Sequence, residues 1–422
     1  MQALKPARAL MFLPLLVSAA LGQFEPYRLR LGPGNEDLER QIQATPWTRY
    51  NTNILMKDVS HVDFSGRDLR LVEINLEGHG LYRANFDDCR LDGSSLIDTW
   101  LLKCSFRNAS LRFCEIDALS RDPRLLNDFR GADITGSWIH GLSGALLQQT
   151  KNFREKRLTS IPLRGDLSGL SFRGFDLYNV SFFFPVEGCD FTEARMQRVV
   201  ISDRFRKEQL YSTANYKSKD LSTLLFQGFA KPENPRERGN FFAWDFSGCE
   251  LSYFLNCDLT DASFEDSLFL RTRGLRLEEM SLDEGVPVWL YYRMVKIAEI
   301  GFDDCLLSEE QLRQTANWKR RDLRGMHLRN MALDGWDFSG LDMQMVDLGG
   351  SSLRGTIFAN SDISGIRLVK CRNLTVAQLL QSVTYSSRAN IVRTHFDVDF
   401  ADLTDEEKEL QAEVRRRHSK GC

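Results

Sequence analysis

Apolar residues return at every fifth position through the most regular stretch of the sequence, residues 321–373. The series begins at Leu323, continues through Leu328 and Leu333, and keeps its spacing as far as Leu368. An amphipathic helix needs apolar residues three and four apart, and a half-buried strand needs alternation. A period of five fits neither. It predicts a solenoid that turns one corner per repeat, in which each turn buries its apolar face only against its neighbours.

The same period recurs upstream with interruptions. A clean run extends from Leu81 to Ile116, and weaker runs follow on either side of residues 231–240, a segment rich in proline and charge. That composition predicts an inserted surface loop. We predict a further coil of large residues at 288–300, for which an amphipathic helix is the alternative.

Four leucine-rich segments have helical spacing and interrupt the five-residue pattern. Ser308 with Gln311, and Thr375 with Gln378, form the capping-box sequence that typically begins a helix. Each segment ends in an aromatic residue, so we predict one short helix per segment with an exit turn that is Thr-Ala-Asn-aromatic in two of them. The segments are residues 142–153, 206–216, 308–318 and 375–385.

The five-residue pattern resembles the pentapeptide-repeat family, whose consensus is A-[D/N]-L-x-x. The resemblance covers roughly half of the chain. It implies a right-handed, four-sided β-helix with about twenty residues per coil. It also implies that the central residue and the residue two before it point inward. We therefore expect a mainly β protein: a right-handed quadrilateral β-helix in several blocks, with short α-helices between blocks and a C-terminal helix.

Combining the two patterns predicts the domain organisation. The C-terminal segment has acids at its start and arginines at its end, which suits a helix that caps the last coil. The expected parts are a signal peptide at 1–22, a lead-in or cap at 23–53, a first pentapeptide block at 54–141, a helix and second block at 142–200, a helix and third block at 201–306 with the inserted loop at 231–240, a helix and fourth block at 307–373, and a degenerate helix with a C-terminal cap at 374–422.

The N-terminus has the pattern of a secretory signal peptide. Lys5 and Arg8 precede a short apolar run, and small residues follow up to Gly22. The run is too short for a comfortable membrane span, so we expect cleavage near Gly22 and an exported protein, periplasmic or extracellular. A buried N-terminal helix is the alternative. The repeat style looks bacterial.

Nine cysteines are present, and eight of them lie two residues before a repeat centre or in the same phase. That inward slot takes a small residue, and cysteine behaves there as a small hydrophobe. Because no two of the eight are about twenty residues apart in the same register, we expect none to stack on another. We favour buried free thiols over disulfides or zinc, with Cys422 at the terminus as the exception.

Charge and motifs exclude several classes of function. The net charge is −3 and 42% of the residues are hydrophobic, so the chain has a sizeable core but no basic surface for nucleic acid. The six histidines are scattered, and no nucleotide-binding or nucleophile motif is present. We expect no catalytic residues and no cofactor.

One acidic series is regular enough to consider as a metal site. Asp322, Asp342 and Asp362 are twenty residues apart, so they would stack on one face, where a ladder of carboxylates could bind Ca²⁺. The family consensus also places Asp or Asn before each centre, and we favour this structural role.

Three functions remain after these exclusions. The first is an exported, non-enzymatic scaffold that binds an unknown protein or cell-envelope partner. The second is a carbohydrate-active or calcium-binding β-helix that uses the acidic face. The third is a DNA-mimicking inhibitor, which the near-neutral charge and expected export disfavour. The sequence does not identify the ligand or the oligomeric state.

Overall fold

The structure is a computed structural model of the chain. It describes residues 29–30, 36–37, 40, 47–51, 54–57, 61–74, 79–119, 126–183, 186–202, 204–228, 238–270, 300–393 and 396–419. The expected signal peptide, residues 288–299 of the coil expected at 288–300, and Cys422 lie outside these residues. The chain divides into two compact units, residues 1–132 with 138–141, and residues 133–137 with 142–422.

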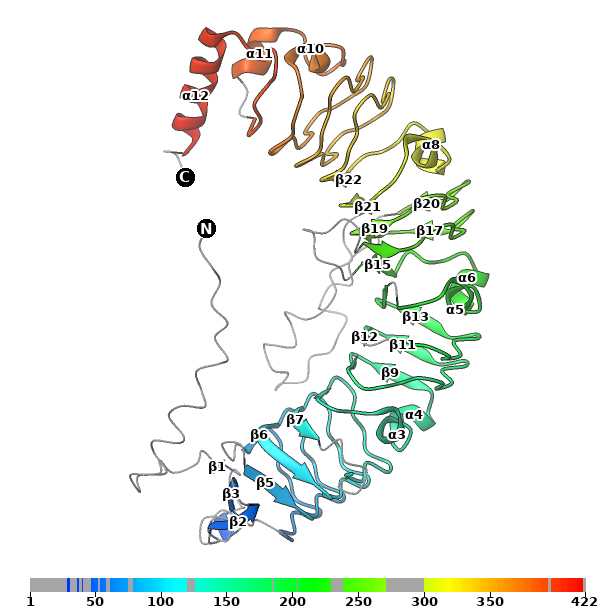
Figure 1. The fold of residues 1–422 in the computed structure, drawn as a ribbon, viewed down its shortest axis with the longest axis vertical. Helices are drawn as coiled ribbons and strands as arrows, with labels where there is room; N and C mark the ends of the chain where they lie inside the picture. Colours follow the sequence, from blue (N-terminus) through cyan, green and yellow to red (C-terminus); the bar gives the residue numbers. More distant parts are fainter. Residues whose placement is uncertain are drawn as a thin grey trace. The chain divides into compact units, whose positions relative to one another are not determined.

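The first unit is built mainly from parallel strands of successive coils (Figure 1). β2 and β3 form an antiparallel hairpin, and β1 lies antiparallel to β4, whereas β4 to β8 pair in parallel. The strands are β1 (Leu29–Arg30), β2 (Trp47–Asn51), β3 (Ile54–Lys57), β4 (Glu73–Ile74), β5 (His79–Tyr82), β6 (Ser95–Leu102), β7 (Glu115–Leu119) and β8 (Trp138–Ile139).

A ladder of phenylalanines fills the core of the first unit. Phe64, Phe86, Phe106 and Phe129 are fully buried and lie at the same place in successive coils. Their ring centroids are 4.5, 4.8 and 5.1 Å apart and the rings are nearly parallel. Each ring therefore completes the packing of the coil before it, as expected of a solenoid.

The second unit continues with parallel pairing throughout its described strands. The longest sheet has the order β14-β15-β18-β21-β22. The strands are β9 (Arg157–Thr159), β10 (Pro162–Leu163), β11 (Asp176–Tyr178), β12 (Ser181–Phe182), β13 (Arg195–Gln197), β14 (Val200–Ile201), β15 (Leu225–Gln227), β16 (Gly239–Asn240), β17 (Glu250–Leu251), β18 (Tyr253–Leu255), β19 (Cys257–Asp258), β20 (Leu268–Phe269), β21 (Ile300–Asp303) and β22 (Met326–Arg329).

After β22 the coils are held by isolated parallel bridges that recur every twenty residues, such as Asp322 to Asp342 and Asp342 to Asp362. The repeat centres from Leu323 to Leu368 are buried, as are most residues two positions before them. The two inward slots expected from the sequence are therefore confirmed. The chain folds as a parallel β-helix, mostly of strands with a few short helices.

The helical segments differ from the expectation of one helix each. Three of them contain two short helices, because a threonine at Thr150, Thr213 or Thr315 caps a second helix where an exit turn was expected. The capping boxes at Ser308 and Thr375 are confirmed. The helices are α3 (Gly144–Leu147), α4 (Lys151–Arg154), α5 (Lys207–Tyr211), α6 (Ala214–Lys217), α8 (Glu309–Arg313), α9 (Ala316–Lys319) and α10 (Val376–Leu379).

Two amide side chains join each of the two later helix pairs, α5–α6 and α8–α9, to the coil before it. The amide nitrogen of Gln311 donates to the backbone carbonyls of Leu259 and Ala262 at 2.6 and 2.9 Å. Asn317 accepts from the backbone N–H of Phe269 at 2.7 Å and donates to its carbonyl at 3.1 Å. These amides therefore replace backbone groups that a strand would supply, which leaves fewer buried polar groups unpaired. Gln209 and Asn215 make equivalent contacts in the preceding pair.

The C-terminal segment covers the last coils of the second unit. α11 (Arg388–Arg393) and α12 (Asp405–Ser419) follow α10. The carboxylate of Asp402 accepts from the first backbone N–H groups of α10, at 2.7 Å from Val376, and pairs with Arg388 at 2.9 Å. These contacts are consistent with a terminal cap.

Two sequence expectations need correction. The inserted loop expected at 231–240 ends earlier, because Gly239–Asn240 form β16 and pair with β19. All eight described cysteines are buried and free, but Cys305 stacks on Cys257 in the neighbouring coil. The sequence concealed this stacking because an insertion between them makes their separation much longer than one coil.

We predict that Phe86→Ala destabilises the first unit by about 3–5 kcal/mol, since a buried ring that stacks on two others would leave a cavity. Urea denaturation followed by circular dichroism measures this loss. Leu71→Ala is the matched control, because Leu71 is 63% exposed and little change is expected. Equal midpoints for the two variants would contradict the stacked core.

Candidate functional site

The three acids of the expected ladder do lie together in one column. Parallel bridges join Asp322 to Asp342 and Asp342 to Asp362, so the residues occupy the same position in three successive coils. All three belong to the second unit. Acids twenty residues apart in the sequence are therefore neighbours in the structure, as expected.

Local donors occupy the carboxylates of this ladder. Arg324 binds Asp322 through two hydrogen bonds of 2.9 and 2.7 Å and lies 3.6 Å from Asp342. Asp362 accepts from the backbone and hydroxyl of Ser364 at 3.0 and 2.6 Å and from Gln344 at 2.7 Å. The Ser364 hydrogen bonds lower the pKa of Asp362 to about 2, and Arg324 lowers the pKa of Asp322. The acids thus fix the turns that follow them.

Metal ligation needs several such groups with free oxygen atoms converging on one point. Within the described parts of the chain, no group of three or more His, Cys, Asp or Glu side chains is placed to hold a metal ion. Each carboxylate of the ladder is instead engaged by donors of its own turn or of the neighbouring coil.

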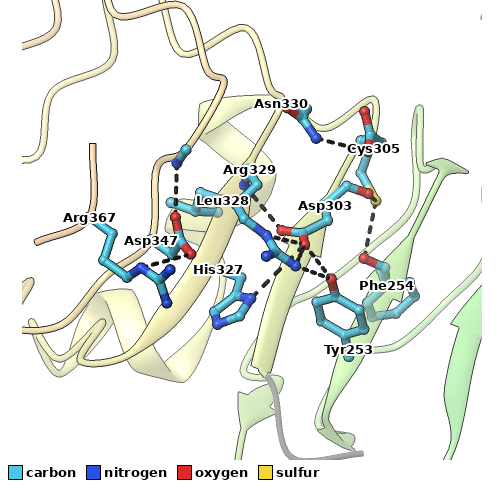
Figure 2. A network of polar contacts seen from close by, with 12 residues as sticks. Tyr253, Phe254, Asp303, Cys305, His327, Leu328, Arg329, Asn330, Asp347 and Arg367 are labelled. Atoms are coloured by element: carbon cyan, nitrogen blue, oxygen red, sulfur yellow. Dashed lines mark hydrogen bonds and ion pairs between the residues drawn. The ribbon is translucent and has the colours of Figure 1, made fainter. Parts of the chain in front are cut away.

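A second polar cluster joins β18, β21 and β22, and the sequence did not indicate it. In parallel register, Tyr253 lies beside Gly301 and Gly301 beside His327, while Asp303 lies beside Arg329. Figure 2 shows these side chains converging on the Asp303 carboxylate. Residues far apart in the sequence thereby meet on one face of the coils.

Asp303 is the centre of this cluster, with a side chain only 3% exposed. It accepts a hydrogen bond from the Tyr253 hydroxyl and forms an ion pair with Arg329, whose Nε lies 2.5 Å from the carboxylate. The backbone N–H of Arg329 also donates to Asp303 at 3.2 Å. Nδ1 of His327 lies 4.0 Å from the same carboxylate, and its ring meets Tyr253 edge-on at 6.1 Å.

The environment of Asp303 changes the proton affinities of its partners. Burial, followed by the hydrogen bond to Asp303, raises the pKa of Tyr253 well above its usual value. The Asp303 hydrogen bond raises the pKa of Arg329. Tyr253 therefore stays neutral and Arg329 stays charged at any ordinary pH, so the cluster contains a neutral donor and a balanced ion pair.

Gly301 makes room for this arrangement. Its φ is +116°, and a Cβ built there would lie 2.2 Å from the backbone oxygen of His327. Only glycine fits such a close approach between coils. The glycine also leaves no side chain between Tyr253 and His327, which allows the two rings to meet.

A second ion pair lies beside the cluster on the next coils. Asp347 is 4% exposed and accepts from the backbone N–H of Gly349 at 2.9 Å. Arg367 approaches Asp347 to 3.6 Å, as Figure 2 also shows. Acidic and basic side chains therefore alternate on this face and neutralise one another. We interpret the ion pairs as contacts that fix the register of neighbouring coils, and not as reactive groups.

A cavity of about 480 Å³ opens near the first acid of the ladder. Strand β20 supplies its apolar side, while α9 and the turns after it supply the polar side. Met345, at its rim, is 62% exposed. The described residues that line the cavity are Leu268, Phe269, Leu270, Ile300, Asn317, Arg320, Asp322, Arg324, Gly325, Gln344 and Met345.

The sequence carried weak signals of these features. Tyr253 occupies the outward slot before the centre Phe254, where Asp or Asn is usual, and Gly301 occupies the same slot before Phe302. These two departures from the consensus indicate the position of the cluster. The pairing of β18 with β21 could not be predicted, because the insertion between β20 and β21 separates the two strands in the sequence.

Comparison with known proteins adds the following findings. No protein-family model matches the sequence, and no curated protein matches it. A pentapeptide repeat protein from the thylakoid lumen of Arabidopsis thaliana is 20% identical over 36% of this chain and 72% of its own, with a TM-score of 0.16. HetL, a pentapeptide repeat protein involved in heterocyst differentiation regulation in the cyanobacterium Nostoc sp. strain PCC 7120, is 15% identical over 78% of this chain and 92% of its own, with a TM-score of 0.14. QnrB1, a plasmid-mediated fluoroquinolone resistance protein, is 11% identical over 84% of this chain and 97% of its own, with a TM-score of 0.13.

Similarities this low carry no argument about shape or function. The fold assignment rests instead on the chain itself, where buried residues recur at every fifth position and coils pair every twenty residues. This is the five-residue pattern through which the chain resembles pentapeptide-repeat proteins.

We predict that Asp303→Asn lowers the free energy of unfolding by about 3 kcal/mol, because removing one charge of a buried ion pair leaves its partner uncompensated. Arg329 keeps some contact with solvent, which holds the loss near the lower end of the range for such pairs. Chemical denaturation measures the change. Asp322→Asn, which removes the acid of an exposed pair, is the control and should have little effect. Equal effects of the two substitutions would contradict a buried role for Asp303.

We also predict that Asp362 contributes to acid stability. Its pKa in the folded protein is about 2, below the usual value, so its contribution is present above about pH 4 and is lost as the pH falls toward 2. Asp362→Asn should therefore reduce the steepness of the loss of stability over that range, as measured from denaturant midpoints at each pH. Ser364→Ala, which removes a donor hydroxyl, should reproduce part of the effect. A wild-type-to-variant difference that stays constant from pH 6 to 2 would refute this assignment.

Proposed function

We propose that this protein is an exported, non-enzymatic scaffold whose coils present a regular surface to a protein or cell-envelope partner. The proposed architecture is a right-handed β-helix with four sides, since centres five residues apart and coils of twenty residues give four corners per coil. Export rests on the signal-like sequence of residues 1–22, and the expected location is periplasmic or extracellular. In the described part of the chain, no helix combines the length and apolar character needed to cross a bilayer.

One observation carries this proposal: equivalent outward-facing side chains of successive coils lie one above another in columns. Asp322, Asp342 and Asp362 repeat one position over three coils, at the inter-strand spacing of about 4.8 Å. Such columns give a partner a series of identical positions to contact, which is how repeat proteins form extended binding surfaces.

Exposed apolar side chains support protein binding in particular. In the described residues after β22, several large apolar side chains reach solvent, including Met345 at 62% and Val383 at 65%. Apolar side chains at a surface often mark interaction sites when they accompany a recess, and Met345 lies at the rim of the cavity beside Asp322.

The condition of the reactive groups supports a non-enzymatic role. The described cysteines are buried, and burial raises the pKa of Cys104 to about 12, so it is not a ready nucleophile. The carboxylates of both polar clusters are engaged by donors within the chain. Acid–base or nucleophilic catalysis requires such groups to face a substrate.

Site-specific photo-crosslinking tests the proposal. A benzophenone-bearing residue is placed at Met345, at Val383 or, as a control in the first unit, at Leu71, which is 63% exposed. Irradiation of cell-envelope fractions should give one shared adduct from Met345 and Val383 and none from Leu71. A scaffold role is refuted if no position forms an adduct and the purified protein turns over an envelope polymer.

A further inference from the structure

Cys257 and Cys305 occupy the same inward position in two neighbouring coils. Their flanking residues define the register: Leu255 pairs with Asp303, and Asp258 pairs with Leu306. The backbone N–H of Leu306 also donates to the carbonyl of Cys257 at 2.9 Å. The two side chains therefore lie directly one above the other.

The two thiols are in contact and buried. Cys257 is 0% exposed and Cys305 is 5% exposed, and the two thiols interact with one another. Each thiol also donates to the carbonyl two residues before it, at 3.3 Å in both cases. The same contacts recur in both coils, so the sulfur atoms point in the same direction.

Other cysteines in the inward slot have a different neighbour. The register places Ser94 next to Cys114 and Ser351 next to Cys371. Serine hydroxyls cannot be oxidised to a cross-link, so the chemistry available at Cys257 and Cys305 is absent from those pairs. Serine is evidently also compatible with the slot, which makes it a conservative replacement.

The spacing of parallel strands suits a covalent bond between these residues. Neighbouring strands are about 4.8 Å apart, and disulfides join Cα atoms that are about 4.4–6.8 Å apart. Little backbone movement is therefore needed to connect the two sulfur atoms.

We propose that Cys257 and Cys305 are a redox-reactive pair that peroxide oxidises to a disulfide joining two successive coils. The thiolate of one cysteine attacks hydrogen peroxide, which breaks the O–O bond and gives a sulfenic acid and hydroxide. The second thiol then attacks that sulfur, displacing the hydroxyl group and losing its proton as water forms. In total, two thiols and one peroxide give one disulfide and two waters.

The disulfide would join two chain positions that are distant in sequence and adjacent in space. It would hold the ends of the intervening segment, which includes β20 and β21, in their present register. Closing a long loop restricts the unfolded chain, so the oxidised protein is more stable than the reduced one. The inference does not depend on the proposed function.

Burial sets the rate of this reaction. Loss of a proton from Cys257 is disfavoured because burial raises its pKa well above the usual value. Since the thiolate is the attacking species, oxidation should be slow at neutral pH and accelerate roughly tenfold per pH unit toward alkaline pH.

Peptide mapping of the full-length protein tests the proposal. Reduced protein is treated with hydrogen peroxide, remaining thiols are alkylated, and a non-reducing digest is analysed by mass spectrometry. The expected product is a peptide linking Cys257 to Cys305, together with a higher melting temperature that returns to its original value on reduction.

Two variants serve as controls. Cys305→Ser should abolish the linked peptide and leave Cys257 as a sulfenic acid that dimedone traps, whereas Cys249→Ser should keep the link. Recovery of both wild-type cysteines as free thiols would overturn the proposal. So would their separate oxidation to sulfinic acids, or a link from Cys257 to a different cysteine. The wild-type mapping remains decisive if a variant fails to fold.

Discussion

Hydrogen bonding between successive coils is the constraint on which the rest of this structure depends. A strand in a β-helix can satisfy its backbone only through the coils on either side, so each coil must keep the register of the one before it. The inward side chains follow from that requirement. Phe64, Phe86, Phe106 and Phe129 stack because the backbone bonds place equivalent residues one above another.

The short helices show how the chain meets this constraint where a strand is replaced. A helix offers few backbone groups to the neighbouring coil, such as the N–H of Ala316, and the amides of Gln311 and Asn317 provide further donors and acceptors. The same solution recurs with Gln209 and Asn215. Helix and coil therefore form one repeating module.

Register is most difficult to maintain where β18 and β19 meet the coil that begins at β21, because partners there are distant in sequence. Three separate contacts fix it. The rings of Phe254 and Phe302 stack at 5.4 Å inside the coil, the Asp303 network holds the outer face, and Cys257 contacts Cys305 in the second inward slot. The polar cluster and the thiol pair thus both hold β18 and β19 in register with the coil that begins at β21.

The sequence by itself determined the period, the two inward slots, the capping boxes and the stacking of Asp322, Asp342 and Asp362, because each depends on residues within one or two regular coils. Only the tertiary structure decided that Tyr253 meets Asp303, that Cys305 lies on Cys257, and that Thr315 begins a second helix where a turn was expected. The first two depend on register across an insertion, which five-residue spacing cannot count through. The last depends on the neighbouring coil, whose exposed backbone groups require the amide that the second helix carries.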